Sequence, residues 1–204
     1  MPRAPILLLH GALDSPRVWE RVAPLLRAAG FEVLLDPTHD GTDPTPQGQA
    51  ERAARLVPPQ GAHLVGHSRG GTAASWLAVE RPETVRSLAV VASPPQPGEA
   101  FRAAFRKRLE RASPEERGTL EYLAALPDDD FPQHALRRWR GATLVVEYED
   151  DPLYSPTHTM FWRMFLPYAS FERVPGGHRA FAESDEAARW LAERLARHVE
   201  AADA

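Results

Sequence analysis

The chain has 204 residues and a formal net charge of −4, with 43% hydrophobic and 25% charged residues. This length indicates a single globular domain over residues 1–204, and this composition excludes a wholly disordered chain. The mild acidity gives no bulk attraction to nucleic acid or anionic lipid. The absence of cysteine excludes disulfides, thiolate metal sites and a cysteine nucleophile.

Apolar stretches are short throughout the sequence. None reaches the ~18 residues that a membrane-spanning helix needs, and the run at residues 6–9 is too short for the core of a signal peptide. We therefore expect a cytoplasmic protein with no membrane partner.

Short apolar runs alternate with stretches of helical periodicity. The runs predict strands, in chain order, at residues 5–9, 31–35, 62–65, 87–92, 143–148 and 170–174. Between and after them, capping residues and apolar spacing predict helices at 15–30, 46–56 and 69–80 and helices that open at Ser155 and Ser184. Connections of this length imply parallel strands. The pattern predicts an α/β three-layer sandwich, with a mostly parallel sheet of about six strands and helices on both faces.

One long segment interrupts this alternation. Residues 94–140 separate the fourth and fifth strands, and they contain helical spacing but no strand signal. Ser113 and Glu116 form a capping-box pattern inside this segment. We expect a short helical insertion that packs over one end of the sheet as a cap.

The sequence from Gly66 to Gly70 matches the pattern G-x-S-x-G. The motif follows a strand signal directly and precedes a helix signal, which is the context of a nucleophile elbow. Ser68 is therefore a candidate nucleophile. The alternative is a glycine-rich turn whose serine has no chemical role.

Four segments together resemble the α/β-hydrolase superfamily. They are His10 with Gly11, the motif from Gly66 to Gly71, Asp151, and Gly177 with His178. Their order along the chain (nucleophile, acid, histidine) is that of the family. Two departures stand out: the family's first antiparallel strand pair is missing, and Tyr148 stands where the family has a glycine.

This resemblance implies a catalytic triad, because a serine hydroxyl needs a base at neutral pH. His178, on a glycine-rich loop after the last strand, is the implied base. A carboxylate must orient it, and the loop after the fifth strand selects Asp151, with Asp150 and Glu149 as competitors. The resemblance also implies an oxyanion hole made by the backbone N–H groups of Ala12 and Arg69.

The substrate pocket is harder to predict. Four apolar residues that flank the catalytic loops are candidates to line it: Leu13, Leu153, Tyr154 and Phe181. The insertion contains four arginines: Arg102, Arg106, Arg108 and Arg111. They could favour an acidic substrate, but the simpler interpretation is that they form a solvated helix face. We expect a small ester or thioester as substrate.

No cofactor or metal is expected. Asp36, His39 and Asp40 resemble a metal cluster, but their loop is rich in turn formers and no further ligand completes a site. Other functions on the same fold remain open, namely a carbon–carbon, lactone or amide hydrolase, or a binding or signalling protein without turnover. The missing first strands also predict an exposed sheet edge through which a homodimer can form.

Overall fold

The computed structural model describes residues 3–37, 43–95, 98–127 and 131–204. Its centre is a six-stranded sheet with the strand order β2-β1-β3-β4-β5-β6. Every adjacent pair of these strands is parallel, which confirms the predicted α/β class. The strands are β1 (Ile6–Leu9), β2 (Val33–Leu35), β3 (Ala62–His67), β4 (Val85–Val91), β5 (Ala142–Tyr148) and β6 (Ser170–Val174).

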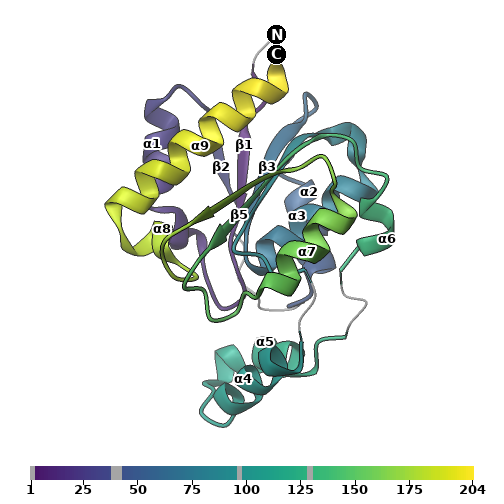
Figure 1. Ribbon diagram of the computed structural model, residues 1–204, viewed down its shortest axis with the longest axis vertical. Coiled ribbons are helices and arrows are strands. Elements are labelled where there is room, and N and C mark those ends of the chain that lie inside the picture. The colour runs from purple at the N-terminus through teal and green to yellow at the C-terminus, as the bar shows by residue number, and fades with distance from the viewer. Residues whose placement is uncertain (1–2, 38–42, 96–97, 128–130) are drawn as a thin grey trace.

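Helices cover both faces of the sheet (Figure 1). One face carries the 3₁₀ helix η1 (Pro16–Trp19), α1 (Val22–Ala28), α8 (Ala180–Glu183) and α9 (Asp185–Asp203). The other face carries α2 (Pro46–Ala54), α3 (Arg69–Glu80), α6 (Gln133–Leu136) and α7 (Pro156–Phe165). A second 3₁₀ helix, η2 (Pro82–Thr84), precedes β4. Successive residues of β1 alternate between the two cores, with Ile6 and Leu8 on one side and Leu7 and Leu9 on the other. A strand buried on both faces must be apolar throughout, and this explains the continuous run in the sequence.

The predicted helix over residues 15–30 is interrupted. It forms as η1 and α1, with Glu20 and Arg21 between them. Pro24 explains the break, because proline lacks an N–H and its ring would clash with the carbonyl four residues earlier. In the first turn of α1, Pro24 is tolerated, so the helix restarts just before it.

The insertion between β4 and β5 divides into two parts. Helices α4 (Glu99–Leu109) and α5 (Pro114–Ala125) pack against each other and project from one end of the molecule (Figure 1). The capping box of Ser113 and Glu116 at the start of α5 is confirmed. Helix α6 instead joins the layer of α3 and α7, where Leu136 is fully buried. The cap-like part is therefore the α4–α5 pair, which is shorter than the predicted segment 94–140.

The edge strands of the sheet are β2 and β6. A homodimer through such an edge stays a prediction. Within the described ranges, no helix combines the length and apolarity required to cross a membrane.

Candidate active site

Ser68 lies at the sharp turn between β3 and α3. It is the one residue between strand and helix, because β3 continues to His67 and α3 begins at Arg69. Its backbone has φ 53° and ψ −125°, a conformation that side-chain-bearing residues rarely adopt. A Cβ atom at Gly66 would lie 2.1 Å from the carbonyl oxygen of Gly70, so only glycine permits this turn. The turn thus has the geometry of a nucleophile elbow.

The loop after β1 lies directly against this turn. A Cβ atom at Gly11 would come within 3.0 Å of the Cβ of Ser68, and one at Gly70 would lie 2.6 Å from the carbonyl oxygen of His10. Ala12 and Arg69, the predicted oxyanion donors, both line the cavity that contains Ser68. The two segments that would supply the donors are therefore adjacent.

His178 and Asp151 are hydrogen-bonded to each other. Nδ1 of His178 lies 2.7 Å from Oδ2 of Asp151, whose side chain is fully buried. The other carboxylate oxygen, Oδ1, accepts a hydrogen bond of 2.8 Å from the backbone N–H of Leu153. Both carboxylate oxygens are thus held, and with Nδ1 bonded to the acid, Nε2 of the imidazole is left as the group that can accept a proton.

The competing acids lie elsewhere. The side chains of Glu149 and Asp150 are exposed. Asp150 is tied into the loop by its backbone N–H, which donates to the carbonyl oxygen of Gly176 at 3.0 Å. The geometry therefore favours Asp151 as the partner of His178.

His67 also belongs to this site, although no local sequence pattern indicates this. Its Nε2 lies 3.0 Å from the carbonyl oxygen of His178, and a carbonyl can only accept, so the Nε2–H donates. Complete burial and the nearby His178 hold the pKa of His67 well below its ordinary value, so the ring is neutral. Phe181 packs edge-on against this ring, with the two ring centroids 5.0 Å apart. His67 therefore supports the loop that carries the predicted base.

A cavity of about 180 Å³ contains Ser68 and His178 together. Of the four predicted pocket residues, Leu13 and Leu153 line it, and Tyr154 and Phe181 do not. Phe181 is fully buried and stacks on Trp19, with the two ring centroids 4.7 Å apart. The Tyr154 hydroxyl donates to Oε1 of Glu147 at 2.8 Å. Both flank a catalytic loop in sequence but point into the protein core rather than toward the cavity.

Of the three residues considered for a metal cluster, the structure describes Asp36. Asp36 is buried, and its Oδ2 accepts a hydrogen bond of 3.0 Å from the Gln49 side chain. His39 and Asp40 lie outside the described residues.

The chain belongs to the alpha/beta hydrolase family, whose model matches residues 6–203. This match covers the sheet, both helix layers and every site residue described above.

Two relatives and one solved structure are similar to this chain. It is 39% identical over 97 residues to a pimeloyl-[acyl-carrier protein] methyl ester esterase of Aeromonas salmonicida, which covers 44% of this chain but only 38% of that relative. It is 30% identical over 187 residues to a putative carbamate hydrolase of Azorhizobium caulinodans, covering 83% of this chain and 68% of the relative. The structure of a Mycobacterium tuberculosis protein superposes with a TM-score of 0.79 at 19% identity, over 95% of this chain and 89% of the other.

Proposed function

We propose that this protein is a serine hydrolase that cleaves a small ester through an acyl-enzyme intermediate. The observation that carries the proposal is the bond between His178 and Asp151, because His178 lines the same cavity as Ser68. The two relatives reported above are named as an esterase and a hydrolase, which supports the same chemistry.

Each residue has a defined role in the proposed reaction. The Oγ of Ser68 attacks the ester carbonyl while Nε2 of His178 removes its proton. Asp151 holds the opposite ring nitrogen and stabilises the imidazolium that forms. The backbone N–H groups of Ala12 and Arg69 bind the oxyanion of the tetrahedral intermediate. His178 then gives its proton to the leaving alcohol.

Water completes the cycle. His178 removes a proton from a water molecule, which attacks the acyl group on Ser68. The second tetrahedral intermediate collapses, the acid leaves, and Ser68 recovers its proton from His178. The strained backbone of Ser68 contributes to the reaction because it holds Oγ at the tip of the turn, where an acyl group can reach it.

A test compares the wild-type protein with Ser68→Ala on p-nitrophenyl esters of increasing acyl length. We expect steady turnover by the wild type and loss of at least about 10³-fold in kcat for the variant. A fluorophosphonate probe should label Ser68 in the wild type alone. Turnover that survives in Ser68→Ala would contradict the proposed nucleophile. If the wild type shows neither turnover nor labelling, a ligand-binding protein on this fold becomes the better description.

A further inference from the structure

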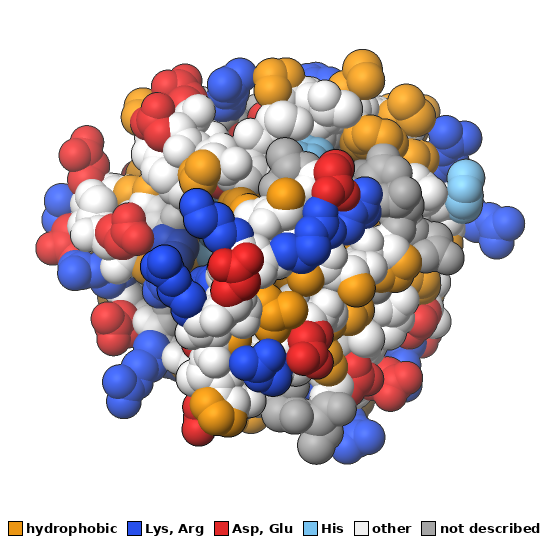
Figure 2. Space-filling model, turned by 90° about the horizontal axis from the view of Figure 1, so that it is seen from below, with side chains coloured by type: hydrophobic (Ala, Val, Ile, Leu, Met, Phe, Trp, Pro, Cys, Tyr) orange, Lys and Arg blue, Asp and Glu red, His pale blue; other side chains and the backbone are white. Residues whose placement is uncertain are grey.

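The charged residues of the cavity wall are mostly arginines. Arg69 comes from the start of α3, Arg108 from α4, and Arg179 from the loop that follows β6. Among the described residues that line the cavity, the one acidic side chain is that of Asp14. Figure 2 shows this end of the molecule, where Lys and Arg side chains lie among Asp and Glu side chains. Three arginines from separate elements thus line one cavity.

The acidic group of the wall is already engaged. An oxygen of Asp14 lies 3.3 Å from the Arg179 guanidinium. Arg108 pairs with Glu116 at 2.7 Å, but Glu116 is not part of the wall, and the Arg108 side chain is 53% exposed. A half-exposed pair of this kind is weak and can exchange its partner.

The cap arginines divide by what they contact. Arg102 and Arg106 donate to the carbonyl oxygens of Leu126 and Ala124, at 3.1 and 3.2 Å, so both join α4 to the end of α5. Arg111 is exposed and does not line the cavity. Of the four arginines noted in the sequence, Arg108 alone is a wall residue.

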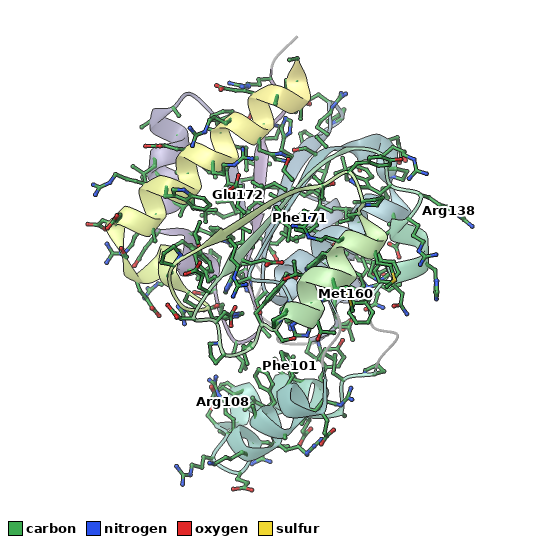
Figure 3. All side chains as sticks on the ribbon, viewed as in Figure 1. Phe101, Arg108, Arg138, Met160, Phe171 and Glu172 are labelled. Carbon is green, nitrogen blue, oxygen red and sulfur yellow. The ribbon has the colours of Figure 1, made fainter. Side chains whose placement is uncertain are left out.

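Apolar side chains complete the wall. Helices α4 and α5 contribute Phe101, Phe105 and Leu123, and the body of the protein contributes Leu13 and Leu153. Figure 3 shows Phe101 and Arg108 on α4, with Phe101 on the side of the cap that faces the body. A substrate that matches this wall has a short apolar part and an anionic group.

We infer that the substrate is an ester that carries a carboxylate, recognised by Arg108 together with Arg69 and Arg179. This inference rests on the proposed function and specifies its substrate class. A guanidinium matches a carboxylate in geometry and charge. The carboxylate is carried either by the acyl part or by the alcohol part of the ester.

The test uses two matched pairs of esters. The p-nitrophenyl monoester of adipic acid and p-nitrophenyl hexanoate differ in charge on the acyl side. Similarly, 4-acetoxybenzoate and 4-acetoxybenzamide differ in charge on the alcohol side. For each pair, the kcat/KM ratio of anionic to neutral ester is measured in the wild type, Arg108→Gln, Glu116→Gln and Arg111→Gln. Intrinsic reactivity cancels when these ratios are compared between proteins.

We expect Arg108→Gln to lower the ratio about 3- to 10-fold in at least one pair. Glu116→Gln should raise it, because this change removes the carboxylate that competes for Arg108 while its amide oxygen can still accept from Ser113. Arg111→Gln removes the same charge outside the cavity and should leave the ratio within about twofold. If the ratios of Arg108→Gln stay within twofold of the wild-type ratios for both pairs of esters, the inference is overturned.

The experiments distinguish failure of the proposed function from failure of the inferred substrate class. If Ser68→Ala abolishes turnover and the ratios do not change, the serine hydrolase proposal stands and the anionic substrate is rejected. If no ester is turned over, calorimetric titration of Ser68→Ala with the adipate monoester and with the hexanoate decides the inference. The monoester should bind more tightly, and Arg108→Gln in the same background should remove the difference. Equal binding of both esters by Ser68→Ala would reject the inference of an anionic substrate.

Discussion

At the scale of single residues, the arrangement of the side chains matters more than their identity. His63 lies 2.9 Å from the hydroxyl of Ser87 through Nδ1 and 3.2 Å from Asp203 through Nε2, so a second serine–histidine–aspartate set exists at the other end of β3. Ser87 is 1% exposed, and no ester can reach it. Ser68 differs because its turn presents the hydroxyl to a cavity. Access and backbone geometry distinguish the candidate site from an internal hydrogen-bond chain.

The assignment of the acid can be tested by paired amide variants. Asp151→Asn should lower kcat by about 10³- to 10⁴-fold, because the amide cannot hold the tautomer of His178 or stabilise its charged form. Asp150→Asn, one residue away and exposed, should change kcat less than about twofold. Steady-state kinetics on one p-nitrophenyl ester measures both. Equal losses in the two variants would argue against Asp151 as the orienting acid.

His67 should act as a positioning residue for the base. His67→Phe keeps an aromatic ring but removes the donor to the His178 carbonyl, and we expect kcat to fall up to about tenfold with little change in KM. His67→Gln places an amide N–H near the position of Nε2 and should restore part of the loss. Failure of Gln to recover any activity, in a variant with normal thermal stability, would contradict a role for this hydrogen bond.

At the scale of elements, close backbone approach explains the glycines of the elbow. Gly70→Ala would place its Cβ 2.6 Å from two backbone carbonyl oxygens, those of Leu9 and His10, at the end of β1. Backbone atoms cannot move aside as a flexible side chain can, so we expect a loss of about 1–3 kcal/mol in the free energy of unfolding. Urea denaturation measures this value.

Gly118 offers the matched control. It lies inside α5, and a Cβ at this position meets no atom within 4 Å. Gly118→Ala should raise helix stability by about 0.5–1 kcal/mol. If the two alanine variants had similar free energies of unfolding, the packing argument for Gly70 would be wrong.

The elements were largely predictable because their signals are local. β6 and α3 were predicted with the observed bounds, since capping, breaking residues and apolar runs all agree there. The break before α1 was also present in the sequence, at Pro24, but apolar periodicity continues across it. The pocket was predicted poorly, because Phe181 and Tyr154 lie next to catalytic loops in sequence, yet local rules do not say toward which side they point. The support given by His67 depends on contact between residues 111 positions apart, which no local pattern reveals.

At the scale of the whole molecule, buried histidines tie stability to pH. Burial lowers the pKa of His198 to about 4, and it also lowers the pKa of His63 and His67. Unfolded histidine ionises near pH 6.5, so between these values the unfolded state binds more protons than the folded state. The free energy of unfolding therefore falls as the pH decreases from about 6.5 toward 4.

His198 alone should account for up to about 3 kcal/mol of this loss. His198→Gln cannot take up the proton, so its free energy of unfolding should fall less steeply over the same range. Urea denaturation at a series of pH values between 4 and 8 measures both slopes. Parallel pH dependence in the two proteins would show that His198 does not contribute.

The two ends of the described chain lie side by side (Figure 1). Arg3 contacts Asp203 at 3.4 Å and Glu200 at 3.7 Å, so the segment before β1 is fastened to the last turn of α9. Residues 200 positions apart are thus neighbours at the end of the sheet away from Ser68. Because the two termini are adjacent, a short linker could join them. The circularly permuted chain could then have new termini elsewhere, for example between α4 and α5, with the same order of strands in the sheet.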